Sequence, residues 1–303
     1  MSSIPKNMFV DAIEKVAEYT RPIHILTREY GSNEVLPGAA TLFFVNELGQ
    51  AVTCKHVAVL IAQAEQVDKC YEEFKKERDA LTGSGGKYKR KLRELEQKYQ
   101  YKEGITVQIK NNFLGCVDKM SSFEIIMHPT DDVAVIKFQG FDKLPYKGYA
   151  TFLKDSSLIK QGKSLCRLGF PFPEFSNFKY NEGNDDIEWT GEGKKETPRF
   201  PIDGMVTRML LGADGTTKGI EISTPGLRGQ SGCPLFDHEG VVYGMQSSTH
   251  HLHLGFDIKD KEIREGSKLK KVSNHPFLHL GNCVHVDIIK SFLKEKGIKF
   301  YEN

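Results

Sequence analysis

Short runs of β-branched and aromatic residues, separated by turn residues, fill most of this sequence and restrict the chain to a mainly β fold. The pattern begins near residue 22 with PIHILTREY, ATLFFVN and AVTCKHVAVL, and it returns later as ITVQIK, FEIIMH, DDVAVIKF and GKSLCRLGFPFP. Such runs predict strands paired in antiparallel hairpins, and Pro171 and Pro173 end one of them. Apolar residues make up 39% of the 303 residues, which is enough for a sizeable core.

Residues 58–103 interrupt this pattern with a charged stretch of helical periodicity. Its apolar residues recur every three to four positions, at Val67, Tyr71, Phe74 and Leu81 and then at Tyr88, Leu92, Leu95 and Tyr99. Because the turn residues 83–86 separate the two sets, the spacing predicts two antiparallel helices, an α-helical hairpin inserted into the β domain.

Further helices and two long loops are predicted outside this hairpin. Residues 1–20 have the periodicity of an N-terminal amphipathic helix, with Pro5 in its first turn. The closing segment VHVDIIKSFLKEKGIKF predicts a strand that runs into an amphipathic C-terminal helix. Residues 174–200 and 254–276 are polar and rich in turn residues, so we expect long surface loops there.

The overall charge and the cysteines argue against several functional classes. A formal net charge of +2 gives no reason to expect a nucleic acid or membrane partner, and the basic residues of the hairpin alternate with glutamates. The sequence has neither a signal peptide at its start nor the roughly 18 apolar residues of a membrane helix. Six scattered cysteines without a CxxC pair indicate free thiols, so we expect a cytoplasmic protein without a cofactor.

The sharpest functional signal is the segment GLRGQSGCPLF, which carries Ser231 on a glycine-rich turn. A nucleophilic serine needs its hydroxyl on a tight turn, close to backbone N–H groups that can stabilise an oxyanion. Gly229 has no side chain to restrict its backbone, so the N–H groups of Gly229 and Ser231 are the expected oxyanion-hole donors. A Gly-x-Ser-Gly sequence by itself is more often only a polar turn.

Two further segments offer a base and an acid. His56 ends the strand-like run AVTCKH, and Asp132 opens the apolar run DDVAVIKF. Each alone has a structural interpretation, as a hydrogen-bonded histidine and as a turn residue. The order His, Asp, Ser along the chain, with each residue in a matching strand or turn context, favours a catalytic triad.

These segments resemble the trypsin-like peptidases, and among them most the protease domain of the bacterial HtrA (Deg) type. TCKHVA resembles the histidine segment, DDVAVIKF the aspartate strand, and GLRGQSGCPLFDHEGVVYGMQS the serine turn with its following hairpin. The resemblance covers most of residues 35–296, except the helical hairpin and the two loops. It implies a chymotrypsin-like fold of two six-stranded antiparallel β-barrels over residues 21–303, and no PDZ-like domain follows it.

The resemblance also assigns roles. Ser231 would attack the scissile carbonyl, His56 would transfer its proton, and Asp132 would orient His56 because it directly precedes the apolar strand as the family's acid does. Asp131 is expected to be solvated. A peptide or protein substrate would pair by β-augmentation with the strand that follows the serine hairpin. The expected substrate-binding residues are Pro225, Gln246, Ser247, Ser248 and Thr249.

Some positions depart from the family pattern without removing a catalytic group. Lys55 precedes the histidine where a small residue is usual, and Cys233 replaces a glycine after the serine. Pro225 stands where trypsin-type enzymes carry an acid, which predicts a preference for a small or medium uncharged residue before the cut. Asp257 is an acid that could fold back into this pocket and reverse that preference.

Two functional hypotheses follow. The favoured one is a serine endopeptidase that works through an acyl-enzyme and is regulated by a protein partner at the helical hairpin. The alternative is a binding or scaffold protein that kept the fold and lost turnover. No metal site is predicted, because no carboxylate or thiolate at suitable spacing completes a site with His250, His251 and His253.

Overall fold

Two β-sheets build the body of the protein. In the computed structural model, which describes residues 8–303, the first sheet has six strands in the order β4-β1-β2-β3-β6-β5, all paired antiparallel. They are β1 (Thr20–Glu29), β2 (Val35–Phe44), β3 (Gln50–Thr53), β4 (Thr106–Asn112), β5 (Ser122–Met127) and β6 (Ala134–Gln139). Strands β4 and β5 are the two edges of this sheet, so it is an open half-barrel.

The second sheet closes on itself. Its order is β13-β8-β11-β12-β17-β14-β7-β18, and β13 pairs with both β8 and β14, which closes a ring of six strands. They are β7 (Thr151–Phe152), β8 (Ser164–Gly169), β11 (Phe200–Leu211), β12 (Thr217–Ile222), β13 (Pro234–Phe236), β14 (Val241–His253), β17 (Phe277–His285) and β18 (Tyr301–Glu302). The predicted mainly β, chymotrypsin-like architecture of two six-stranded units is confirmed, with the first unit open where a closed barrel was expected.

A helix covers the open edge of the first sheet. Helix α2 (Lys55–Asp79) follows β3 directly and packs against β4 and β5. The Asp68 carboxylate on α2 accepts a hydrogen bond of 3.0 Å from the backbone N–H of Ile109 on β4 and forms an ion pair with Lys110. The helix therefore protects a strand edge that would otherwise be free to pair with other chains.

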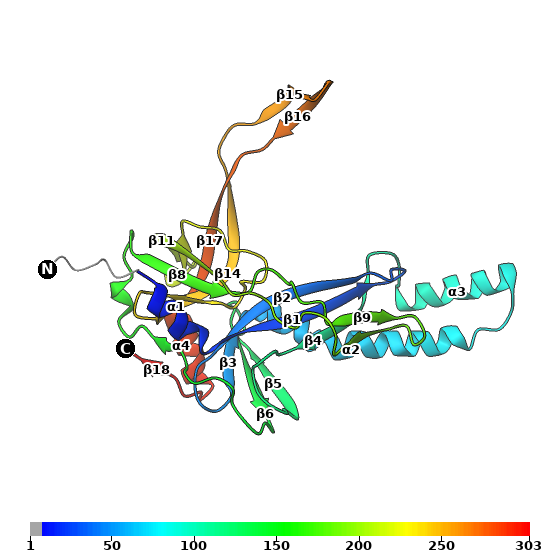
Figure 1. Cartoon of the computed structure of the whole chain (residues 1–303), viewed down its shortest axis with the longest axis horizontal. Coiled ribbons are helices and arrows are strands. Elements are labelled where there is room, and N and C mark those ends of the chain that lie inside the picture. The colour runs from blue at the N-terminus through cyan, green and yellow to red at the C-terminus, as the bar shows by residue number, and fades with distance from the viewer. Residues whose placement is uncertain (1–7) are drawn as a thin grey trace.

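The inserted helical hairpin is formed by α2 and α3 (Gly85–Tyr99), and its outer part projects from the body (Figure 1). Its periodic apolar residues form a small separate core in which Tyr71, Phe74 and Leu95 pack with Val107 of β4. The base of the hairpin is therefore fixed to the first sheet. The helix begins at Lys55, before the predicted residue 58, so His56 lies on the helix and not at the end of the strand.

Helices also lie near the two ends of the chain, as predicted. Helix α1 (Val10–Ala17) and helix α4 (Val286–Glu295) bury apolar side chains in the main core, together with inward-facing residues of both sheets. A short 3-10 helix, η1 (Ser156–Leu158), lies between them in sequence. The predicted first turn at Pro5 lies outside the described residues. No helix within residues 8–303 has both the length and the apolar character to cross a membrane.

The two stretches expected to be long loops contain β-hairpins instead. Strands β9 (Phe178–Asn181) and β10 (Asp186–Trp189) pair within the first stretch. Strands β15 (Ile258–Glu265) and β16 (Lys268–Asn274) pair within the second and form an arm that extends from β14 and β17 away from the body (Figure 1). Their polar composition favoured loops. The β9–β10 hairpin instead packs Ile187 against Leu26 and Phe175 in a small apolar cluster, whereas cross-strand pairs hold the exposed β15–β16 ribbon.

Candidate active site

The open sheet brings His56 and Asp132 together. Strands β3 and β6 are neighbours, with Thr53 opposite Ala134, so the residues just beyond these two strand ends meet. His56 lies in the first turn of α2 and Asp132 in the turn before β6. The distance from His56 Nδ1 to Asp132 is 2.9 Å for Oδ2 and 3.1 Å for Oδ1, and the backbone N–H of His56 donates to Oδ1 at 2.9 Å. The carboxylate thus fixes both the ring and its backbone.

Hydrogen bonds keep the Asp132 carboxylate ionised. Burial raises its pKa, but donors outweigh burial and hold the pKa well below its usual range. These donors are the His56 ring, the Ser247 hydroxyl at 2.5 Å from Oδ2, and the His56 backbone N–H. Because an ionised carboxylate only accepts hydrogen bonds, His56 Nδ1 carries the proton, and Nε2 of the neutral ring is left free to accept one.

Asp131 has different partners. Its carboxylate lies 3.3 Å from Lys218 Nζ and 3.5 Å from His128 Nδ1, and its backbone N–H donates to the His128 ring at 2.8 Å. Its side chain is mostly buried, which contradicts the expectation that it is solvated. The acid that contacts His56 is Asp132.

Ser231 lies on a tight turn in the closed barrel. The backbone N–H of Gln230 donates to the Leu227 carbonyl at 3.0 Å, and Gly229 at the third turn position has φ +95°, as a type II turn requires. A Cβ at Gly229 would lie 2.5 Å from the Phe170 carbonyl oxygen, so glycine is needed for space as well as for conformation.

The Ser231 hydroxyl connects indirectly to the histidine. It donates to the Ser247 carbonyl at 3.4 Å, and within residues 8–303 no hydrogen bond joins it to the His56 ring. The Ser247 hydroxyl in turn donates to Asp132. The structure therefore arranges the residues as a chain, His56 to Asp132 to Ser247 to Ser231.

The backbone of the serine turn is attached to the first sheet by Thr41 of β2. The Thr41 hydroxyl donates to the Gly229 carbonyl at 2.8 Å, and its backbone N–H donates to the Ser231 carbonyl at 2.9 Å. In contrast, the N–H groups of Gly229 and Ser231 donate to no acceptor among the described residues. Two backbone donors next to the serine are thus available for an incoming anion, as the oxyanion-hole expectation requires.

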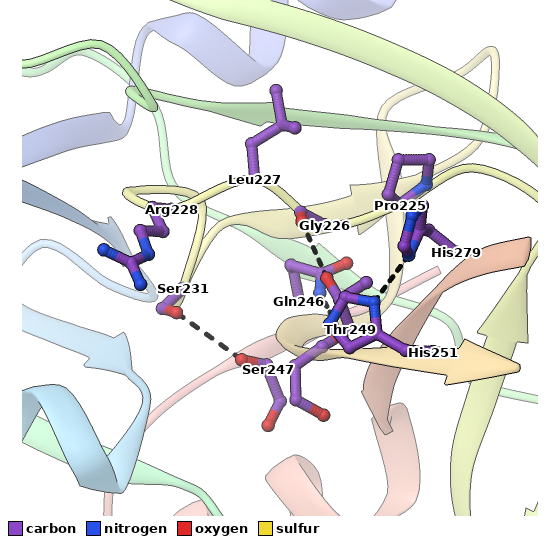
Figure 2. A pocket seen from close by; sticks show the side chains of 11 residues that line it. Pro225, Gly226, Leu227, Arg228, Ser231, Gln246, Ser247, Thr249, His251 and His279 are labelled. Carbon is purple, nitrogen blue, oxygen red and sulfur yellow. Dashed lines mark hydrogen bonds between the residues drawn. The ribbon is translucent and has the colours of Figure 1, made fainter. Parts of the chain in front are cut away.

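A pocket of about 600 Å³ adjoins Ser231 (Figure 2). Its lining is Pro225, Gly226, Leu227, Arg228, Ser231, Gln246, Ser247, Ser248, Thr249, His251 and His279. All five residues expected to bind substrate are among them. The Thr249 hydroxyl donates to the Gly226 carbonyl at 2.6 Å, and the Gln246 amide donates to the Ser248 carbonyl at 2.7 Å, so internal hydrogen bonds fix the two walls.

Asp257 does not line this pocket. One of its carboxylate oxygens lies 2.8 Å from His253 Nε2 and 2.8 Å from His275 Nδ1 at the base of the β15–β16 arm. These three residues could offer ligands to a metal ion. However, the Gly255 N–H donates to His253 Nδ1 at 3.1 Å, which makes His253 Nε2 the protonated nitrogen and an unsuitable ligand.

Cys54 beside the triad candidates is also a poor ligand. Its thiol is fully buried and donates to the Gln246 carbonyl at 3.1 Å. Burial and the neighbouring Asp132 carboxylate raise the pKa of the thiol, so the thiolate that a metal needs is disfavoured. Cys233 is likewise fully buried, as expected of a small hydrophobic residue.

Several site residues were not found from the sequence. The roles of the Thr41 and Ser247 hydroxyls, and the presence of Arg228, His251 and His279 in the pocket, depend on contacts between distant segments. The alternation of His251 and His253 on one strand face was visible, but their partners come from β17 and from the arm. No local pattern marked those partners.

Comparison with protein families matches residues 40–245 to the trypsin-like peptidase domain. The match covers more than half of the sequence and includes all three triad candidates, and this chain therefore belongs to the trypsin-like peptidase family. No curated protein matches the sequence significantly. Among solved structures, an HtrA-type protease, AlgW with a tripeptide, is similar with 14% sequence identity and a TM-score of 0.46. The match covers 95% of this chain and 64% of that chain.

Proposed function

We propose that this protein is a serine endopeptidase in which Ser231 is the nucleophile, His56 the general base and Asp132 the residue that orients His56. The main support is the ionised Asp132 carboxylate, which fixes His56 Nδ1–H and leaves Nε2 free to act as a base. Family membership and the free N–H groups of the serine turn agree with this proposal.

The chemistry then follows from these groups. Ser231 Oγ adds to the scissile carbonyl carbon while its proton moves to His56 Nε2, and the oxyanion accepts hydrogen bonds from the N–H groups of Gly229 and Ser231. Collapse of the intermediate breaks the C–N bond, and His56 returns the proton to the leaving amine. Water attacks the acyl-enzyme by the same route and releases the acid and free Ser231.

The substrate has a free strand edge to pair with. Strand β13 pairs with β14 only as far as Met245, so from Ser247 onward one edge of β14 has no neighbouring strand among residues 8–303. An extended peptide that pairs there by β-augmentation would place its scissile carbonyl beside Ser231. The side chain of the residue that carries this carbonyl would enter the pocket. The peptide would compete with Ser231 for the Ser247 carbonyl and so release the hydroxyl toward His56.

One observation favours the alternative of a binding protein without turnover. The Ser231 hydroxyl is bonded to Ser247 and not to His56. Catalytic hydrogen bonds are, however, often long in free enzymes and shorten when substrate binds. A fluorophosphonate probe separates the two functions, since a working triad is labelled at Ser231 and a silent site is not. Labelling that is absent in the wild type, or that persists in Ser231→Ala, would contradict the proposed function.

The helical hairpin is proposed as a docking arm for an acidic protein partner. Helix α3 exposes basic side chains, among them Lys87, Lys89 and Arg93, on the part that projects from the body. Changing these three residues to Glu should slow cleavage of an acidic unfolded protein such as casein and leave small-peptide cleavage unchanged. The matched control changes Lys259, Lys261 and Lys268 of the β15–β16 arm to Glu. Equal effects of the two sets would contradict a docking role of α3.

A further inference from the structure

Two histidines form one end of the pocket beside Ser231. His251 of β14 and His279 of β17 are directly opposite each other in the strand register, and their Nδ1 atoms are 2.5 Å apart. Figure 2 shows the two rings joined by this hydrogen bond, close to Thr249. One Nδ1 must donate and the other accept, so the accepting ring, when neutral, carries its proton on Nε2. The pair therefore presents at least one N–H donor in addition to the bond between the rings.

The pocket has basic side chains and no acid. Its eleven lining residues include Arg228 and the two histidines, but no Asp or Glu. Arg228 is exposed, and its guanidinium takes part in no hydrogen bond or ion pair within residues 8–303. Asp257, which the sequence offered as an acid for this pocket, is bound to His253 and His275. A carboxylate that entered this pocket would meet donors without an internal competitor.

Several other polar side chains of the pocket are already bonded. The Thr249 hydroxyl and the Gln246 amide donate to backbone carbonyls of the walls. A lysine side chain would therefore find no ionised partner among the residues that line the pocket. An apolar side chain would cover the donors without bonding them, and a glutamine amide would form only neutral hydrogen bonds, which are weaker than charge-assisted ones.

We propose that this pocket selects an acidic side chain, and Glu over Asp, at the residue whose carbonyl Ser231 attacks. The assignment rests on the proposed function, because it needs Ser231 as the attacking group. Arg228, His251 and His279 are the specificity-determining residues. Glu is favoured over Asp because its side chain is one methylene longer and reaches further from Ser231 toward the histidine pair on the other side of the pocket (Figure 2). This replaces the expectation of an uncharged residue, which considered only Pro225 and the facing strand.

The test uses a set of internally quenched peptides that differ only in the residue before the cut, as Glu, Asp, Gln, Ala or Lys. We expect kcat/KM for Glu to exceed that for Gln by about tenfold or more and that for Lys by about 100-fold or more. His279→Leu and Arg228→Ala should each lower the ratio of Glu to Gln cleavage by about tenfold. His275→Ala removes a histidine that does not line the pocket and should leave the ratio unchanged.

Labelling of Ser231 by the fluorophosphonate distinguishes a wrong pocket assignment from a wrong peptidase assignment. If turnover is too slow to measure, peptide aldehydes ending in the same residues compete with labelling, and protection by the Glu aldehyde supports the assignment. Labelling combined with a preference for Ala or Lys overturns the acidic pocket and leaves the peptidase intact. Absence of both labelling and cleavage overturns the peptidase and the pocket assignment with it.

Discussion

The open sheet and the closed barrel contribute to the candidate site in different ways. The open sheet supplies two side chains, His56 and Asp132, which hold each other through three hydrogen bonds. The closed barrel supplies mainly backbone, since the serine turn depends on the positive φ of Gly229 and on N–H groups that are left free. Proton transfer thus depends on side-chain identity, and anion stabilisation depends on the shape of the chain.

Hydrogen bonds beside the site join the two halves in addition to their shared apolar core. Thr41 of the open sheet holds two carbonyls of the serine turn, and Ser247 of the barrel reaches back to Asp132. The alignment of a triad divided between two sheets depends in part on these bonds, because effective catalysis needs the reacting atoms within a few tenths of an ångström. Loss of a reacting group and loss of alignment should therefore lower turnover to different extents.

The largest effect should come from removing a reacting group in either half. Ser231→Ala or His56→Ala should each lower peptide turnover by about 10⁶-fold, because nucleophile and base act in one step. The double variant should be no worse than either single one. Steady-state kinetics on one quenched peptide measures this, and circular dichroism checks that the fold is kept. Strictly additive losses would show that the two residues do not work as a unit.

Exchange of the acid in the open sheet should have the next largest effect. Asp132→Asn should reduce kcat by about 10⁴-fold, because an amide favours the wrong tautomer of His56. Asp131→Asn is the matched control, since Asp131 pairs with Lys218 and not with His56. If Asp131→Asn is the more damaging of the two, the orienting acid has been assigned to the wrong neighbour.

The sequence predicted the candidate catalytic residues, but it did not predict the residues that hold them in position. Glycines at 229 and 232, and acids at the start of an apolar strand, are local signals, and they led to Ser231 and Asp132. Thr41 lies 190 residues before Ser231, inside an ordinary apolar run, and Ser247 looked important only for its backbone. The fold class was equally predictable from strand periodicity. Closure of a barrel depends on pairing of distant edge strands, which periodicity does not encode.

Weakening the link between the halves should give a smaller loss. Thr41→Val removes the hydroxyl that donates to Gly229 and accepts from the Phe170 N–H, which leaves buried polar groups unpaired. We expect a destabilisation of about 1–3 kcal/mol and a fall in kcat of about tenfold. Urea denaturation and peptide kinetics measure the two effects. Thr217→Val is the control, because the half-buried Thr217 of β12 has no side-chain hydrogen bond within residues 8–303, and it should change neither quantity.

Removing the bond from Ser247 of the barrel to Asp132 should have a still smaller effect. Ser247→Ala removes a donor that lowers the pKa of Asp132, so that pKa should rise toward its usual value. Asp132 stays ionised at neutral pH in this variant, so only the positioning of His56 is weakened and we expect a fall in kcat of a fewfold. Peptide kinetics measures the loss, and Thr217→Val again serves as the control. An unchanged kcat in Ser247→Ala would mean that Ser247 does not help to position Asp132.

The last prediction concerns folding stability and a buried histidine in each half. Its effect on activity at neutral pH should be the smallest, and it separates the two halves best. His24 of the open sheet is fully buried against Phe175, and burial lowers its pKa to about 4. His285 of the closed barrel is also buried, and its pKa is lowered for the same reason. In the unfolded chain both bind a proton near pH 6.5. Because the unfolded state binds protons more readily, folding stability must fall as the pH drops below about 6.5.

Replacing one histidine at a time shows which half responds to acid. Between pH 7 and pH 4, His24 should cost the wild type about 2–3 kcal/mol of unfolding free energy. His24→Gln should therefore be less stable than wild type at pH 7 but lose less stability on acidification, and His285→Gln should reduce the pH dependence in the same way. Urea denaturation at each pH, with the exposed His238→Gln as control, gives the slopes. If neither variant flattens the pH dependence, buried neutral histidines are not what makes this protein acid-sensitive, and its carboxylates must be.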